Sequence, residues 1–409
     1  MLAQQQKTTA PKFIRGDRIW DMSRVKDHDK IRMELTDLIR FKGCWYCGFR
    51  EGFMHGAHPS GRGRIIRSAG GKKWESVFLK EWDCASVGEI KLSITSEGML
   101  MANTAIYFVS REARPDGHCK AFDIYDRPLP SGGKYGRYYQ LEDPGTPEND
   151  SEMNAARQSV TWLSEDGVNW GSAYACPTGV NAWRWEVSWH NGMGYSVGYC
   201  GKDKQGTLYR TRDGKSWRVL LNNFFPGGGN EAALAFGADS TAYCLLRGAR
   251  LRKISAAMKK TMKDIDGHQI GTDMSRGYHG TNVPMLGIGK APYYQEWEWR
   301  DLTVDWNGDG NFKTTDEVLR SDFGGPKITR LRDGRFVATA RNLGPGRDDG
   351  HITLFWLDTA KARLTMFAEC AGATYGAAVE HEEKLWVSYA GKDRPGYLSV
   401  FLAKIKIPT

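Results

Sequence analysis

The sequence predicts an all-β fold arranged as the six blades of a β-propeller. Two observations carry this prediction: a turn motif that recurs along the chain, and short strand patterns that alternate with turn residues. The composition agrees, because 40% hydrophobic and 26% charged residues are typical of a globular protein, and 12% aromatic residues favour strands. At 409 residues the chain is long enough for a large core and one or two domains.

The turn motif has the form Ser/Thr-x-Asp-Gly-x-x-Trp. Complete copies occupy residues 164–170 and 211–217, and a degenerate copy at residues 68–74 has Gly70 in place of the aspartate. The glycine suits the positive φ of a tight turn between antiparallel strands, and the hydroxyl and carboxylate bond to backbone amides of the turn. The tryptophan packs on the base of the hairpin. The motif therefore marks architecture and performs no chemistry.

The strand patterns group into six units of roughly 50 to 65 residues, each of about four strands, which is a repeat length typical of propeller blades. Asn-Gly and Asp-Gly pairs are strong signals for the tight turns between these strands. The predicted strand pairs turn, in chain order, at residues 42–43, 96–98, 191–192, 238–239 and 333–334. The last unit spans residues 376–389 and 397–407.

A single propeller domain is expected over residues 18–409, after a polar N-terminal extension at residues 1–17. Residues 111–158 are rich in Gly, Pro, Asp and Tyr and predict a long loop or insertion. A blade hidden in this region would raise the count to seven. Residues 17–22 are expected to close the ring against the last blade.

The net charge of +9 favours anionic partners. We expect an acidic glycan rather than nucleic acid, because the chain has no Lys/Arg tract and no nucleic-acid-binding motif. The many aromatic side chains also suit stacking on sugars. No run of 18 apolar residues is present, so no membrane partner is expected. The sequence does not indicate an oligomeric state.

The first six residues have no apolar signal core, which fits either a trimmed signal peptide or a native start. We expect a secreted or periplasmic protein, and a cytoplasmic location is the alternative.

The chain has eight cysteines, of which Cys44 and Cys47 have CxxC spacing. No second CxxC pair accompanies them, and strand positions three apart turn their sulfurs to opposite faces. Buried free thiols are therefore expected rather than a zinc or redox site.

Several stretches resemble the sialidase superfamily over nearly the whole chain. The turn motif resembles the Asp-box, or BNR repeat, of sialidase-like β-propellers. Residues 49–52, Phe-Arg-Glu-Gly, followed by His55, resemble the FREGxxH signature of bacterial exo-sialidase-like proteins. The FRIP signature of true sialidases is absent, and Glu89-Ile90-Lys91 stands where many relatives have Asp-Pro-Lys. The resemblance thus implies the fold, and leaves specificity for sialic acid open.

The resemblance also implies a site built from distant residues. Glu231 and Arg247, sixteen residues apart, match the Asn-Glu and the arginine of one sialidase hairpin, and Tyr375 stands where sialidases place their nucleophilic tyrosine. The aspartate expected as general acid is missing, and its loop carries His55 and His58 instead. The substrate-binding positions that the resemblance implies are Arg50, Arg247, Arg341, Glu89 and Arg32.

The chemistry of these side chains fits that interpretation. A tyrosine has an ordinary pKa of about 10 and is a poor nucleophile at neutral pH, but a neighbouring carboxylate can take its proton as the attack proceeds. His55 suits a general acid or base because the pKa of histidine lies near neutrality. We expect Arg50, His55, Glu231, Arg247 and Tyr375 to converge on the propeller axis. The alternative is a tyrosine that fills the axial channel and bonds to a structural glutamate.

An independent motif at residues 305–316 matches a calcium loop. Oxygen-bearing side chains fall at loop positions 1, 3, 5, 7 and 12, and Gly310 stands at position 6, where the chain turns sharply. The predicted ligands of a structural Ca²⁺ are Asp305, Asn307, Asp309, Asn311 and Asp316. A polar hairpin tip without metal is the alternative, and no organic cofactor is expected.

The function expected first is a carbohydrate-active enzyme, an exo-acting glycoside hydrolase that removes a terminal, acidic sugar from a glycan. A polysaccharide lyase acting on a uronate polymer is the second interpretation, with Tyr375 or His55 as base and acid. A glycan-binding propeller without catalysis is the third.

Overall fold

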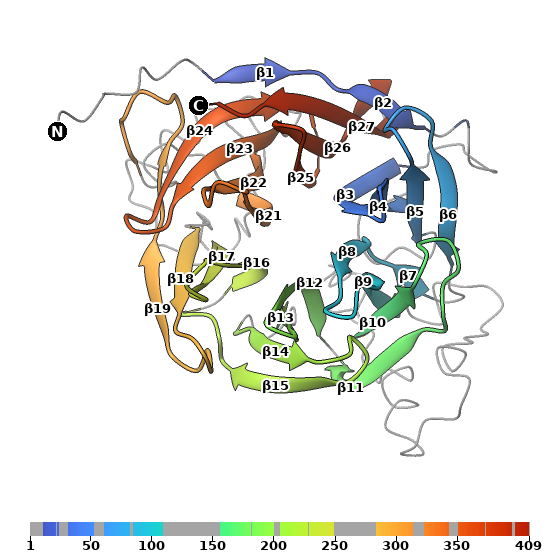
Figure 1. Ribbon diagram of the computed structural model, residues 1–409, viewed down its shortest axis with the longest axis horizontal. Coiled ribbons are helices and arrows are strands. Elements are labelled where there is room, and N and C mark those ends of the chain that lie inside the picture. Colours follow the sequence, from blue (N-terminus) through green and yellow to red (C-terminus); the bar gives the residue numbers. More distant parts are fainter. Residues whose placement is uncertain are drawn as a thin grey trace, which may run out of the picture.

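The computed structural model consists of six β-sheets arranged radially around a central axis (Figure 1). The predicted all-β, six-bladed propeller is therefore confirmed. The structure describes residues 11–21, 23, 32–52, 61–81, 85–108, 156–180, 182–199, 205–227, 229–248, 284–313, 323–342, 351–372, 374–394 and 397–408. The predicted insertion therefore lies almost wholly outside the described residues, as do His55, His58 and Asp316.

The first three blades follow the chain from the axis outwards. Blade 1 contains β3 (Arg32–Phe41), β4 (Cys44–Gly52), β5 (Arg62–Ser68) and β6 (Glu75–Lys80). Blade 2 contains β7 (Ala85–Val87), β8 (Lys91–Ile94), β9 (Leu100–Phe108), β10 (Ala156–Ser164) and β11 (Tyr174–Val180). Blade 3 contains β12 (Trp183–His190), β13 (Met193–Tyr199), β14 (Thr207–Thr211) and β15 (Trp217–Asn222).

The last three blades repeat this order. Blade 4 contains β16 (Gly229–Phe236), β17 (Ala242–Gly248), β18 (Met285–Gly289) and β19 (Trp297–Asp301). Blade 5 contains β21 (Phe323–Arg330), β22 (Phe336–Asn342), β23 (His351–Asp358) and β24 (Arg363–Cys370), with β20 (Thr303–Asp305) beside β24. Blade 6 contains β25 (Gly376–His381), β26 (Lys384–Arg394) and β27 (Tyr397–Lys406).

The N-terminal strands close the ring. β2 (Asp17–Trp20) pairs antiparallel with β27 and becomes the outermost strand of blade 6, as the sequence predicted. β1 (Lys12–Ile14) pairs in parallel with β24 of blade 5. The predicted polar extension is thus partly a strand of the propeller, because its backbone completes the edge of a sheet.

The turn motif forms the hairpin between the third and fourth strands of its blade. In blade 2, Gly167 donates its N–H to Ser164 Oγ at 2.8 Å, and Asp166 Oδ1 accepts from Asn169 N at 2.7 Å. In blade 3, Gly214 donates its N–H to Thr211 Oγ1 at 2.9 Å. Gly167 and Gly214 have φ values of 78° and 72°, which an L side chain rarely adopts. The two copies therefore make the same turn for the same reason.

Apolar residues fill the wedges between neighbouring blades. The cluster between blades 1 and 2 joins Tyr46 and Ile65 to Val160 and Trp162, all buried. Burying a side chain of this size contributes about 1.5–3 kcal/mol to the stability of the fold, so the packing between blades stabilises their arrangement. The five described cysteines are free thiols, and Cys47 is buried while Cys44 is half-buried. Among the described residues, no helix has the length and apolar character needed to cross a membrane.

Candidate functional site

The centre of the candidate site is the hydroxyl of Tyr375, which immediately precedes the innermost strand of blade 6. Tyr375 is 4% exposed and donates its O–H to Glu231 Oε1 at 2.5 Å. Gly325 of blade 5 lies against the ring, and a Cβ at Gly325 would clash with it. Tyr375 and Glu231 are 144 positions apart in the sequence. The ring arrangement of the blades brings them together, as the sequence predicted.

Arg247 connects the two oxygen-bearing groups. Its Nη1 donates to Glu231 Oε2 at 3.0 Å and to Tyr375 Oη at 3.1 Å. Gly325 also donates its N–H to Glu231 Oε2, at 2.7 Å. The Tyr375 hydroxyl therefore donates its proton to a carboxylate held in place, while the Arg247 guanidinium donates to the hydroxyl oxygen. This arrangement favours proton transfer to Glu231 as negative charge develops on the phenol.

Further cations surround the Tyr375 ring. The Arg341 guanidinium lies 4.9 Å from the ring centroid. The Lys91 ammonium lies 4.2 Å from the ring centroid of Trp185 and 5.8 Å from that of Tyr375. Trp185 and Tyr375 meet edge to face, with their centroids 5.6 Å apart. Three positive side chains from blades 2, 4 and 5 thus lie around Tyr375, and they make its surroundings attractive to an anion.

Tyr199 of blade 3 connects Glu89 with this centre. Burial, and then the charges of Glu231, Tyr107 and Glu89, raise the pKa of Tyr199 well above its ordinary value. Tyr199 therefore stays protonated and neutral. Glu89 is 5% exposed and lies between β7 and β8. Glu89, a sequence-predicted binding position, thus acts on the same tyrosine as Glu231.

Arg50 and Arg32 lie in blade 1. Arg50 is buried on β4, and its Nη2 donates to Ser86 Oγ of blade 2 at 3.2 Å. Arg32 begins β3, and its Nε lies 3.0 Å from Glu34 Oε1. Their predicted role in binding substrate stays a prediction, as does the role of His55, which lies outside the described residues.

The innermost strands of five blades share a backbone irregularity at the residues that form the site. Five innermost strands carry one more residue than their partner strand at the same depth, which is a β-bulge, a feature that re-aims side chains near functional sites. The register shifts fall between Glu34 and Asp37, Arg184 and Val187, Gly229 and Ala232, and Gly324 and Lys327. In blade 2 it falls between Val87 and Lys91, which face Ile106 and Asn103 of β9. Glu231, Trp185, Gly325 and Glu89 all stand in these bulges.

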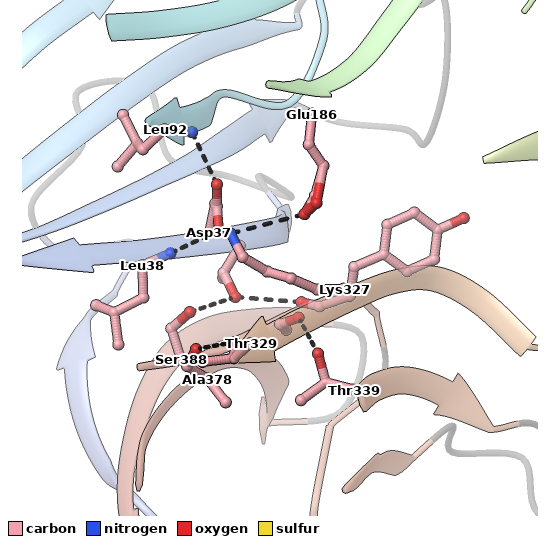
Figure 2. Close-up of polar contacts among 12 residues, drawn as sticks. Asp37, Leu38, Leu92, Glu186, Lys327, Thr329, Thr339, Ala378 and Ser388 are labelled. Carbon is pink, nitrogen blue, oxygen red and sulfur yellow. Dashed lines mark hydrogen bonds and ion pairs between the residues drawn. The ribbon is translucent and has the colours of Figure 1, made fainter. Parts of the chain in front are cut away.

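A cluster of charges lies where the innermost strands of blades 1, 3 and 5 meet (Figure 2). Figure 2 shows Lys327 between Asp37 and Glu186, which come from β21, β3 and β12. The Lys327 ammonium forms an ion pair with Asp37 Oδ1 and lies 3.8 Å from Glu186 Oε1. Asp37 also accepts the N–H of Leu38 at 2.9 Å and that of Leu92 at 2.7 Å. We call Asp37, Glu186 and Lys327 the axial cluster.

The axial cluster is largely shielded from water, with side-chain exposures of 1% for Asp37, 10% for Glu186 and 19% for Lys327. Burial opposes the charge of Lys327, but Asp37 and Glu186 outweigh it and raise the pKa of the ammonium. Burial raises the pKa of Glu186 to about 7, although Lys327 acts in the opposite direction. Lys327 is therefore charged at neutral pH, while Glu186 changes its proton state there.

The axial cluster, Lys91 and Trp185 were not predicted as site residues. Lys91 was visible in the sequence as the last residue of Glu89-Ile90-Lys91. A further signal was available in Asp37, because the neighbouring Leu35, Leu38 and Ile39 indicate a buried strand, in which a charged residue needs a partner.

The predicted calcium loop begins at Asp305, the last residue of β20, which lies beside β24 in blade 5. Asp305 is 1% exposed, and its carboxylate accepts the N–H of Asn307 at 3.1 Å, of Asp309 at 3.2 Å and of Gly310 at 2.7 Å. Gly310 has a φ of 86°. In the described ranges, which end at residue 313 here, no group of three or more His, Cys, Asp or Glu side chains is placed to hold a metal ion. The described donors are two carboxylates and two amides, which are the oxygen ligands that Ca²⁺ takes.

The comparisons with known proteins agree with the fold. No family model and no curated protein matches the chain. It is similar to a solved protein of unknown function from Dyadobacter fermentans, with a TM-score of 0.63 and 14% identity over 98% of this chain and 99% of that one. It is similar to the GH93 α-L-arabinofuranosidase of Fusarium graminearum, solved with arabinobiose, with a TM-score of 0.55 and 11% identity over 96% and 98% of the two chains.

A Hadza microbial sialidase is also similar, with a TM-score of 0.52 and 10% identity over 92% of this chain and 66% of that one. At these identities the likeness shows the fold alone. The chain therefore has the six-bladed, sialidase-like propeller fold that α-L-arabinofuranosidases and sialidases share.

Proposed function

We propose that the protein is an exo-acting glycoside hydrolase that removes a terminal, acidic sugar from a glycan. The observation that carries the proposal is the Tyr375 hydroxyl, held 2.5 Å from Glu231 and 3.1 Å from Arg247. In the first step, Tyr375 Oη attacks the anomeric carbon and its proton passes to Glu231. The glycosidic C–O bond breaks, and the leaving oxygen takes a proton from a general acid, for which His55 is the candidate.

The second step restores the enzyme. Water attacks the same carbon, the bond to Tyr375 breaks, and the phenol takes its proton back from Glu231. The proton of the attacking water goes to the general base, which is the residue that acted as acid. The atoms of one water molecule are thus divided between the two products.

Charge and burial support an acidic, terminal substrate. Arg247, Arg341 and Lys91 place three cations near the Tyr375 ring. A neutral tyrosine nucleophile avoids the repulsion that a carboxylate nucleophile would exert on an acidic sugar. The low exposure of Tyr375 and Glu231, 4% and 6%, favours approach by the end of a glycan over approach by the middle of a polymer.

A screen of acidic glycans tests the proposal directly, with reducing ends and ultraviolet absorbance read in parallel. New reducing ends without ultraviolet absorbance are expected. Absorbing, unsaturated products would replace the hydrolase with a lyase, and binding without either product would indicate a glycan-binding propeller. Arabinobiose belongs in the screen as a neutral substrate, because a structural neighbour was solved with it. Cleavage of arabinobiose alone would contradict the acidic-substrate part of the proposal.

Substitution of Arg341 separates charge recognition from chemistry. Arg341→Gln is expected to raise KM for the acidic sugar by on the order of tenfold, because a hydrogen bond to a charged group contributes about 1.5–3 kcal/mol. The value of kcat should change little. The methyl ester of the same sugar is the matched control, because it has lost the negative charge, and its KM should be equal in wild type and variant. An equal rise in KM for acid and ester would contradict charge recognition by Arg341.

We further propose a structural Ca²⁺ in the loop that begins at Asp305, and a secreted or periplasmic location, where millimolar calcium fills such a loop. Asp305, Asn307, Asp309 and Asn311 are its described candidate ligands; Asp316, the fifth predicted ligand, lies outside the described residues. The ion would stabilise the loop by bridging side chains that otherwise repel.

Calcium is expected to raise the melting temperature. A free concentration 100 times Kd corresponds to about 2.7 kcal/mol of added stability. The exposed residue Asp309 offers a mild variant, and Asp309→Ala should abolish the shift while leaving the metal-free melting temperature unchanged. An identical melting temperature in calcium and in chelator would contradict the site.

A further inference from the structure

We infer that the axial cluster of Asp37, Glu186 and Lys327 positions the reactive tyrosine and its base, and that it transmits the proton state of Glu186 to them. The inference rests on the proposed function for its kinetic consequence and on the contacts of three bulges for its geometry. Each bulge contributes one residue to the cluster, and a residue one or two positions earlier in the chain contacts Tyr375 or Glu231.

The contact in blade 5 is the most direct. Lys327 ends the bulge of β21, and Gly325, two residues earlier, donates its N–H to Glu231 Oε2 at 2.7 Å. Gly325 also supports the face of the Tyr375 ring and has a φ of 56°, so its backbone holds an unusual conformation. A lysine anchored on the axis therefore fixes the amide that orients the base.

The bulge of blade 1 holds the backbone of the nucleophile. Thr36 donates its N–H at 3.2 Å and its Oγ1–H at 3.1 Å to the carbonyl oxygen of Tyr375. Thr36 Oγ1 also lies 3.0 Å from Ser388 Oγ of blade 6. The next residue is Asp37, the first anion of the cluster. The position of Asp37 and the position of the Tyr375 backbone are thus set by one short segment.

The bulge of blade 3 joins the second anion to the aromatic wall. Glu186 follows Trp185, whose ring centroid lies 5.6 Å from that of Tyr375. The Lys91 ammonium lies 4.2 Å from the same Trp185 ring and also acts electrostatically on Glu186. A change at Glu186 therefore reaches Tyr375 through its sequence neighbour and through Lys91.

The two anions are held very differently. Lys327 and the backbone N–H groups of Leu38 and Leu92 all donate to Asp37, so three donors hold its carboxylate in place. Glu186 has Lys327 as its ion-pair partner at the longer distance of 3.8 Å. Glu186 is therefore the more weakly held carboxylate of the axial cluster.

Four charged or titratable groups face Glu186 from the elements packed around it: Lys327 on β21, Asp37 on β3, Lys91 on β8 and Cys244 on β17. Burial, then Glu186, raises the pKa of the Cys244 thiol, which therefore stays neutral. Lys327 and Lys91 are cations, so ionised Glu186 holds Lys327 from the side opposite Asp37. Protonation of Glu186 removes its ion pair with Lys327. The bulge of β21 is then held by the ion pair between Lys327 and Asp37.

Tyrosine NMR tests this coupling without any substrate. With ring-labelled tyrosine, the Tyr375 signal is assigned as the one missing in Tyr375→Phe. In the wild type this signal is expected to shift with a midpoint near pH 7. In Glu186→Gln, which keeps the size of the side chain and removes its titration, the shift should disappear. The same titration in both proteins would overturn the inference.

A matched control distinguishes the effect of Glu186 on the axis from the effect of replacing any buried carboxylate. Glu369 on β24 is 8% exposed and pairs with His351 at 3.3 Å, away from the axis. Glu369→Gln should leave the Tyr375 titration unchanged. Loss of the titration in Glu369→Gln as well would show a general loss of packing, which overturns the specific role of Glu186.

Kinetics provide the second readout. The wild-type kcat is expected to rise on the order of tenfold as pH increases through 7, because small misplacements of reacting groups reduce rates strongly. In Glu186→Gln, kcat should stay at the lower level, with KM nearly unchanged. A wild type without hydrolysis in the glycan screen would reject the proposed function, and the NMR titration would still decide the positioning role. A pH profile that is the same in wild type and Glu186→Gln would reject that role.

Discussion

Tyr375→Phe is expected to reduce kcat by a factor of 10² to 10⁴ or more while the fold is preserved. The substitution removes one hydroxyl, and with it the bond to Glu231 at 2.5 Å and the bond from Arg247 at 3.1 Å. Glu231 retains its bonds to Arg247 and Gly325, so the carboxylate stays paired. The measurements are kcat on the best substrate of the glycan screen, and thermal melting.

Tyr389→Phe is the matched control in the same blade. Tyr389 is buried, and its hydroxyl accepts the N–H of Gly16 at 2.7 Å, a bond that involves none of Tyr375, Glu231 and Arg247. Its removal should reduce stability by about 1 kcal/mol and leave kcat unchanged. Full activity in Tyr375→Phe would reject the nucleophile role, and equal losses in both variants would indicate a general structural effect.

Lys327→Met is expected to reduce the free energy of unfolding by about 3 kcal/mol at pH 8. The variant leaves Asp37 and Glu186 on the axis without their shared cation, and an uncompensated buried charge is the expensive outcome when an ion pair is broken. We expect the lower end of the known range because the Lys327 side chain is 19% exposed. Urea unfolding at fixed ionic strength measures the loss.

The pH dependence gives the sign of this effect. Lys327 opposes the rise in the pKa of Glu186 that burial causes, so without this cation folding favours protonated Glu186 more strongly. Stability from a raised pKa is present at low pH and is lost as pH rises through the folded value, so the variant should recover part of its deficit at pH 5. Lys361→Met, which breaks an exposed pair with Asp358, should change stability little at either pH. A deficit in Lys327→Met no larger than in this control would contradict the prediction.

Local sequence signals were sufficient for the fold. Asn191-Gly192 lies at the turn between β12 and β13, and Gly334 of Asp333-Gly334 has a φ of 90° between β21 and β22. These turns depend on a few adjacent residues, so they can be read without tertiary information. The repeated Ser/Thr-x-Asp-Gly-x-x-Trp motif then gave the blade period.

The site was predicted in part. The approach of Tyr375 to Glu231 followed from resemblance and from the convergence of inner strands, and the structure places them 2.5 Å apart. The axial cluster could not be predicted in this way, because Asp37, Glu186 and Lys327 share no local pattern and meet only when three blades face one another. The bulges that aim these residues depend on cross-strand register, which the sequence does not display.

Ring closure by β2 has a consequence for a chain that is still being synthesised. Glu231 and Arg247 belong to one hairpin, so they can meet soon after both have been translated. Tyr375 follows Glu231 by 144 residues, which a ribosome adds in roughly 7 to 30 s at 5 to 20 residues per second. During that interval the base and the arginine exist without the tyrosine. The reactive centre therefore forms in two stages. The second stage requires blade 6, in which β2 pairs with β27.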